Sequence, residues 1–103
     1  MPYRALTTQE ISDKTSNLFE KYPIEKASVF GSCSRNEMKR GSDIDILVEF
    51  SDLSNPLLFV ELAQKLKRLL QRKVDLISYS SLEYSELKNE ILSEAKVIYE
   101  KRH

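Results

Sequence analysis

The sequence predicts an α/β (α+β) fold: a single mixed β-sheet with helices packed mainly on one side. Helix-type and strand-type hydrophobic patterns alternate along the chain, and the segments between them are short. Such an order is typical of helices layered on one sheet. The length of 103 residues suits one domain and is too short for two hydrophobic cores. We therefore expect residues 1–103 to form a single domain.

Charge and cysteine content narrow the function classes. Sixteen basic residues balance sixteen acidic ones, whereas proteins that grip long nucleic acid usually carry a positive excess. One cysteine excludes an internal disulfide and favours a reducing compartment. No apolar stretch approaches the roughly 20 residues that span a bilayer. We expect a soluble cytoplasmic protein with no membrane attachment and no direct binding of long nucleic acid.

The N-terminal third predicts a helix followed by a strand. Thr7 and Glu10 have the spacing of a capping box, and an amphipathic helical pattern follows until Pro23 stops it. Residues 27–30 are apolar and partly β-branched, which is typical of a buried strand. That strand is expected to end at Gly31.

The middle of the chain predicts a helical turn, a strand and a longer helix. The turn is expected over residues 34–39. Residues 43–50 show the clearest strand pattern, because acidic and aliphatic side chains alternate at its start. Asn55 is expected as the N-cap and Pro56 as the first residue of the next helix, which carries its apolar side chains over residues 57–70.

The C-terminal third predicts a strand and a helix, followed by a segment of less definite structure. Residues 73–77 are the third strand. Ser80 and Glu83 suggest a second capping box, opening a helix that continues to about Ala95. Residues 96–99 are compatible with a fourth strand or with more of that helix, and we favour the strand.

Three aspartates indicate metal chemistry. Side chains two apart on a strand point to the same face, so Asp43 and Asp45 place two carboxylates side by side. Asp75 lies in another short apolar strand and would complete a cluster if that strand is adjacent. Clustered carboxylates repel one another, and a divalent cation relieves that repulsion. Oxygen ligands with open positions suit Mg²⁺ or Mn²⁺, and two such ions can promote in-line displacement at a phosphate.

A glycine and a serine precede this acidic pair by ten residues. Gly31 would let backbone approach a ligand closely, and Ser32 would offer its hydroxyl and backbone N–H groups to phosphate oxygens. Arg35, one turn further on, could face the same phosphates with bidentate geometry. Each feature alone has an ordinary explanation as a turn or a strand edge. Their combination is a much more specific indication of a metal–nucleotide site.

This arrangement resembles the minimal nucleotidyltransferases (MNT) of the DNA polymerase β-like superfamily, over nearly the whole chain. The resemblance implies the polymerase β-like nucleotidyltransferase fold, ATP as substrate, and two Mg²⁺ ions with Mn²⁺ as a possible substitute. One departure is Asn36, which stands where many members of the family have glycine. By the resemblance, Asp43, Asp45 and Asp75 are catalytic and bind metal, while Gly31, Ser32 and Arg35 bind the nucleotide.

The resemblance also implies a partner. Many free-standing MNT proteins form hetero-oligomers with HEPN-domain ribonuclease toxins, which they neutralise by transferring AMP from ATP to a tyrosine. Our leading prediction is therefore a protein adenylyltransferase that acts as an antitoxin. Two alternatives stay open: nucleotidyl transfer to a small molecule such as an aminoglycoside, and a non-catalytic antitoxin that acts by steric cover. Transfer to a nucleic-acid end is disfavoured by the neutral charge.

Two further features are unassigned. The segment 57–70 is apolar over more than one helical face, which hints at a protein interface. A basic run surrounds the end of the same helix, and it is either a solvated surface or a docking face for a partner. The run consists of Lys65, Lys67, Arg68, Arg72 and Lys73.

Overall fold

The computed structural model describes residues 6–31, 43–52 and 55–101. Helix α1 (Thr8–Glu20) begins with the capping box that the sequence predicts. The Glu10 backbone N–H donates to Thr7 Oγ1 at 3.1 Å, and the Thr7 N–H donates to Glu10 Oε1 at 3.4 Å. Ile11 and Phe19 are fully buried on the inner face of the helix. The helix ends three residues before Pro23, which fixes φ and lacks a backbone N–H.

Two antiparallel strands form the centre of the sheet. Strand β1 (Ile24–Phe30) starts three residues earlier than its apolar pattern predicts, because Glu25 and Lys26 are strand residues despite their charge. Strand β2 (Ile44–Phe50) confirms the predicted strand and pairs with β1 along its length. The helical turn predicted over residues 34–39 lies outside the described residues.

Helix α2 (Leu57–Leu70) forms a crossover that brings β3 (Val74–Ser78) alongside β2 in parallel. The prediction of Asn55 as the N-cap is wrong by one residue, because the N-cap position is Pro56. The Asn55 side chain still accepts the Leu57 N–H at 3.1 Å, just before the helix. Pro56 stands one position before the helix and not inside it.

The helix predicted from Ser80 to about Ala95 is wrong. The chain forms a 3₁₀ helix, η1 (Tyr79–Tyr84), and a separate short helix, α3 (Lys88–Glu94). Between them, the Ser85 hydroxyl accepts the backbone N–H of Leu87 at 3.1 Å. A local bond of this kind competes with helix continuation. The capping box predicted from Ser80 is absent, since η1 has no side-chain cap.

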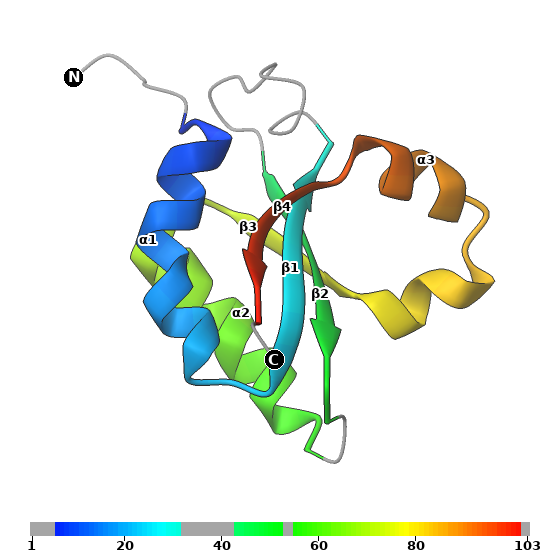
Figure 1. Cartoon of the computed structure of the whole chain (residues 1–103). Coiled ribbons are helices and arrows are strands. Elements are labelled where there is room, and N and C mark those ends of the chain that lie inside the picture. The colour runs from blue at the N-terminus through cyan, green and yellow to red at the C-terminus, as the bar shows by residue number, and fades with distance from the viewer. Residues whose placement is uncertain (1–5, 32–42, 53–54, 102–103) are drawn as a thin grey trace.

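Strand β4 (Lys96–Glu100) confirms the strand favoured for residues 96–99, and it pairs antiparallel with β1. The sheet order is therefore β3-β2-β1-β4, with β2 and β3 as the parallel pair (Figure 1). No helix in the described part of the chain is long and apolar enough to cross a membrane.

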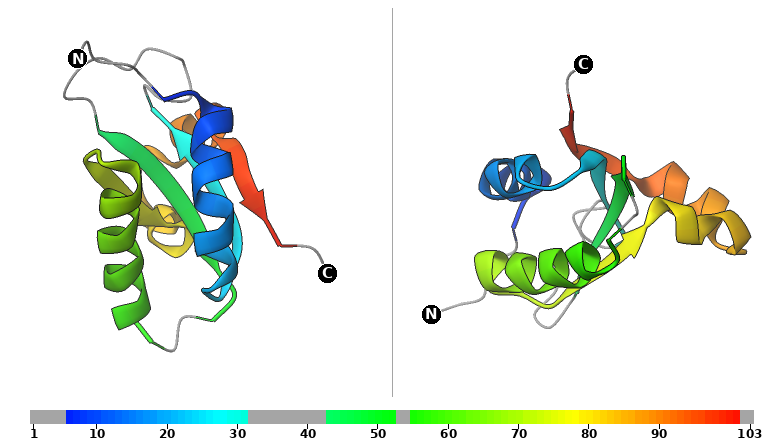
Figure 2. Two further views of the ribbon diagram at one scale, coloured as in Figure 1. Left: turned by 90° about the vertical axis from the view of Figure 1, so that its left-hand side faces the viewer. Right: turned by 90° about the horizontal axis from the view of Figure 1, so that it is seen from below.

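The sheet separates a large hydrophobic core from a small one. Helices α1 and α2 cover one face of the sheet, while η1 and α3 lie against the other (Figure 2). The mixed sheet with its two longer helices on one side is the predicted architecture. The small core on the second face contains Phe30, Leu47, Leu82 and Ile91, with Ile77 packed against it.

Candidate functional site

Asp45 and Asp75 occupy paired positions on the parallel strands β2 and β3. Adjacent strands lie about 4.8 Å apart, and paired residues project from the same face of a sheet. Ile44 and Ile46 are fully buried towards the helices, so Asp45 between them belongs to the opposite face. Asp75 is exposed. The predicted role of Asp75 was conditional on an adjacent strand, and β3 is adjacent to β2, with Asp75 paired to Asp45.

Asp43 lies immediately before β2 and is exposed. The strand ladder begins at the next residue, where the Ile44 N–H donates to the Lys73 carbonyl at 2.8 Å. The described residues contain no group of three His, Cys, Asp or Glu side chains close enough to hold a metal ion. The fold thus brings Asp45 and Asp75 together and places Asp43 just before β2, at the same end of the strands. In the described residues these three carboxylates do not form a cluster.

Gly31 follows the last residue of β1 and turns away from the strand with φ of +69°. This left-handed conformation favours glycine. Phe30 pairs with Asp45 in the β1–β2 ladder, which brings Gly31 next to the aspartate. A Cβ atom at Gly31 would overlap Oδ2 of Asp45. The backbone angle therefore favours glycine here, and any larger residue would also displace the Asp45 carboxylate.

The remaining predicted nucleotide-binding residues, Ser32 and Arg35, lie outside the described residues, as does Asn36. Among the described residues, the candidate site consists of Gly31, Asp43, Asp45 and Asp75.

The described donor set fits a hard divalent cation. All the candidate ligands are carboxylate oxygens, which Mg²⁺ and Mn²⁺ prefer. Asp45 and Asp75 are adjacent across the sheet, and the missing side chain at Gly31 gives the Asp45 carboxylate the space that it occupies. Asp45 and Asp75, with Asp43 at the same edge, are the residues that would hold such an ion.

A hollow of about 290 Å³ lies further along the same sheet face, under η1 and α3. Leu47 lines it from β2, two residues beyond Asp45, while Tyr79 and Leu92 line it from η1 and α3. The sequence pattern did not predict this hollow, because it predicted one continuous helix over residues 80–95. The available signal was Leu47 itself, an apolar residue in the alternating positions that otherwise carry Asp43, Asp45 and Glu49.

Comparison with known proteins identifies the family. The family described as "Polymerase beta, Nucleotidyltransferase" matches residues 13–103. The protein adenylyltransferase MntA of Thermococcus cleftensis is 41% identical over 81 residues, which cover 75% of this chain and 82% of MntA.

Solved structures extend the likeness to three dimensions. A toxin–antitoxin structure with AMP-PNP has a TM-score of 0.70 and 27% identity, covering 88% of this chain and 74% of the matched chain. A mutant of the MntA–HpeT toxin–antitoxin, with two aspartates two positions apart changed to glutamate, has a TM-score of 0.73 and 26% identity over the same shares. A tri-AMPylated Shewanella oneidensis HEPN toxin in complex with MNT antitoxin has a TM-score of 0.67 and 26% identity, covering 92% and 74%.

The family match spans most of the chain, and it agrees with the mixed sheet and with the paired aspartates beside a positive-φ glycine. The chain belongs to the polymerase β nucleotidyltransferase family.

Proposed function

We propose that this protein is a Mg²⁺-dependent protein adenylyltransferase that transfers AMP from ATP to a tyrosine of a cognate HEPN ribonuclease toxin and thereby acts as its antitoxin. The observation that carries the proposal is the pairing of Asp45 with Asp75 beside Gly31, in a chain of a nucleotidyltransferase family. The related toxin–antitoxin structure with AMP-PNP supports the use of ATP. The tri-AMPylated HEPN toxin supports a HEPN protein as the acceptor.

The chain's own residues would divide the work. Asp43, Asp45 and Asp75 hold the metal, and Gly31, Ser32 and Arg35 hold the nucleotide phosphates. Bound divalent cations supply positive charge that offsets the charge developing on the phosphates.

The reaction is an in-line displacement at the α-phosphorus of ATP. The phenolic oxygen of the acceptor forms a bond to that phosphorus as the bond to the bridging oxygen of the β-phosphate breaks. Pyrophosphate leaves with the electron pair, and the phenolic proton passes to water. Asp45 and Asp75 would contribute by holding the divalent cations, because carboxylates on their own repel phosphate oxygens. Holding the reacting groups in one geometry supplies much of the rate in such transfers.

The complex is expected to be a cytoplasmic hetero-oligomer of this chain with the toxin. The sequence relatives and three related solved structures favour a protein acceptor over a small molecule.

Intact-mass spectrometry tests the proposal. This protein, Mg²⁺, ATP and the cognate HEPN protein are incubated together, and the masses of both chains are followed over time. We expect one or more AMP additions on the HEPN chain. The rate should fall by about 100-fold or more in Asp45→Asn and Asp75→Asn, because each loses a metal ligand worth several kcal/mol of barrier.

Asp13→Asn is the matched control, because Asp13 is an exposed aspartate of α1 bonded only to Gln9 among the described residues. It should leave the rate unchanged. A complex that forms without any AMP addition would overturn the enzymatic proposal and favour steric neutralisation.

A further inference from the structure

Helices α1 and α2 lie side by side on the sheet face opposite to η1 and α3 (Figure 2). A groove lies between these two helices. Its volume is about 500 Å³. Cationic side chains from both helices flank it, and two leucines lie among them. We call this surface the basic groove. Its defining residues are Lys14 and Leu18 of α1, Lys21 at the C-cap of α1, and Lys65, Arg68 and Leu69 of α2.

The basic groove concentrates positive charge in a chain whose formal net charge is zero. None of its lining residues is a carboxylate. Within the described part of the chain, Lys14, Lys21 and Arg68 form no ion pair. Lys65 pairs with Glu61 at 2.9 Å, beside the groove.

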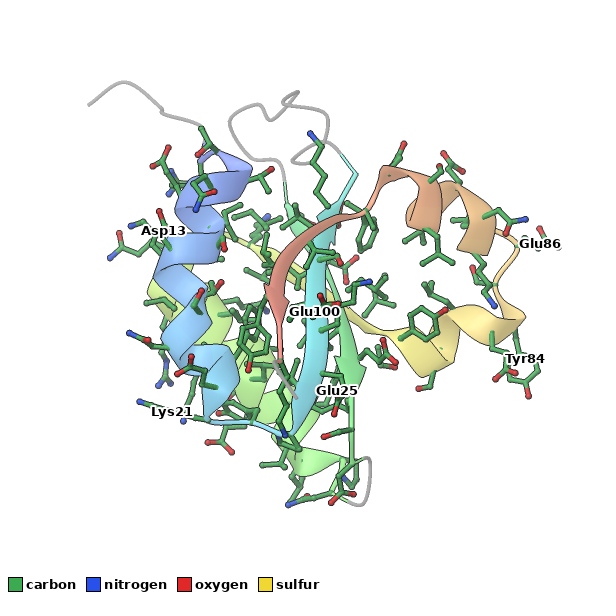
Figure 3. All side chains as sticks on the ribbon, in the orientation of Figure 1. Asp13, Lys21, Glu25, Tyr84, Glu86 and Glu100 are labelled. Carbon is green, nitrogen blue, oxygen red and sulfur yellow. The ribbon has the colours of Figure 1, made fainter. Side chains whose placement is uncertain are left out.

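Lys14 of α1 and Lys21 at its C-cap line the groove, whereas none of the acids of α1 does. Lys14 and Lys21 are seven residues apart and share one side of the helix. Glu20 faces a separate hollow beside β4, which it lines with Tyr99. Figure 3 shows the side chains of Asp13 and Lys21 on the outer surface of α1. The groove lining therefore takes cations and no carboxylate from this helix and its cap, although Glu10 lies one turn before Lys14 on the same side of α1.

The two leucines favour an acidic protein helix over a nucleic acid as the ligand of this groove. Leu69 is 41% exposed although it lies between charged residues, and Leu18 lines the same groove. A nucleic-acid backbone would use the cations and gain nothing from the leucines. An acidic amphipathic helix would contact both the leucines and the cations. It lays apolar residues spaced i, i+3/i+4 and i+7 into a groove, while the acidic side chains on its flanks face the cations at the groove's rims.

We propose that the basic groove docks an acidic amphipathic helix of the protein that this chain modifies. The identity of that protein rests on the proposed function, whereas the groove and its charge do not. A helix seated between α1 and α2 leaves the opposite sheet face uncovered. The groove therefore holds the partner while the Asp45–Asp75 pair stays accessible to nucleotide and acceptor.

Fluorescence anisotropy with a defined probe tests the docking site. The probe is a labelled helical peptide of about 18 residues with leucines at i, i+3/i+4 and i+7 and glutamates on its flanks. The comparison ligands are a peptide of the same composition in scrambled order and a single-stranded RNA of similar length. We expect the patterned peptide to bind at least about tenfold more tightly than either.

Charge reversal locates the binding. The double variant Lys14→Glu/Arg68→Glu should weaken peptide binding by about tenfold or more. The matched control Lys67→Glu/Lys101→Glu makes the same charge change at exposed positions outside the groove and should bind within about twofold of wild type. Thermal melts of both variants verify that they are folded.

Three results would overturn the proposal: equal binding of the patterned and scrambled peptides, tighter binding of RNA, or wild-type peptide affinity in a folded groove variant. The titration uses no nucleotide, so it is independent of catalysis. If AMP transfer fails while the peptide still binds, the proposed function is wrong but the docking site is not.

Discussion

At the residue scale, Gly31 and Asp45 constrain each other. The chain leaves β1 with a positive φ at Gly31, and the carboxylate of Asp45 occupies the space that a side chain there would fill. The sequence motif marks both residues as candidates. It contains no information on the register that pairs Phe30 with Asp45, which is what places the glycine against the carboxylate.

Replacing Gly31 with alanine should therefore cost stability and activity together. We expect Gly31→Ala to lower the free energy of unfolding by more than about 1 kcal/mol, since alanine is strained at positive φ, and to slow AMP transfer by at least about tenfold. Chemical denaturation and intact-mass rates measure the two effects. In an Asp45→Ala background the overlap is gone, so the stability cost should shrink; an unchanged cost would show that Asp45 is not the obstacle.

The Glu61–Lys65 pair gives a prediction about pH. The Lys65 ammonium donates to the Glu61 carboxylate and holds the pKa of Glu61 below its usual value, while the same hydrogen bond raises the pKa of Lys65. A lowered carboxyl pKa adds stability that is present above the usual glutamate pKa and is lost as pH falls through the lowered value. The raised lysine pKa adds stability that is lost only as pH rises through that higher value.

Wild type should therefore unfold at a slightly higher denaturant concentration than Glu61→Gln near neutral pH, and the difference should vanish in acid. Both side chains are about half exposed, so the effect is small. Urea titrations across acid and neutral pH measure it. A difference that grew as the pH fell would contradict the assignment.

At the element scale, the sequence patterns gave the wrong prediction for the elements on the second face of the sheet, η1 and α3. The capping box of α1 was predictable because its two bonds join residues three apart in the chain. The split between η1 and α3 depends on two buried side chains, Leu82 and Ile91, that both reach a small core formed with Phe30 and Leu47. Such tertiary contacts override a local helical pattern and leave no periodic signal.

Leu82→Ala should destabilise the protein by about 2–4 kcal/mol, because Leu82 is 2% exposed and anchors η1 to the sheet. The melting temperature should fall by roughly 10 °C or more. Tyr84→Ala is the control on the same short helix: Tyr84 is 90% exposed and stands at the outer end of η1 (Figure 3), so its loss should change stability by less than about 0.5 kcal/mol. Equal effects would show that the small core does not hold η1.

At the scale of the whole molecule, the sheet separates two kinds of surface. The aspartates and Gly31 lie at one edge on the face that η1 and α3 only partly cover, while α1 and α2 present the basic groove on the other side. The sequence predicted the strands and the aspartates separately. The parallel crossover through α2 brings Asp75 into register with Asp45, and this depends on the three-dimensional path of a chain segment nearly 30 residues long.

The basic groove was visible in the sequence only in part. Lys65 and Arg68 belonged to a recognised basic run, but Lys14 and Lys21 lie some fifty residues earlier and looked like ordinary surface lysines. Only the packing of α1 beside α2 brings the two sets together.

The most direct test of the central claim is metal-dependent nucleotide binding at the Asp45–Asp75 edge. Mn²⁺ is titrated into the protein with AMP-PNP, and bound Mn²⁺ is followed by electron paramagnetic resonance. Wild type and Asp13→Asn should bind equally, while folded Asp45→Asn and Asp75→Asn should each lose at least about tenfold in affinity. Wild-type affinity in both variants would show that this pair of carboxylates is not the metal–nucleotide site.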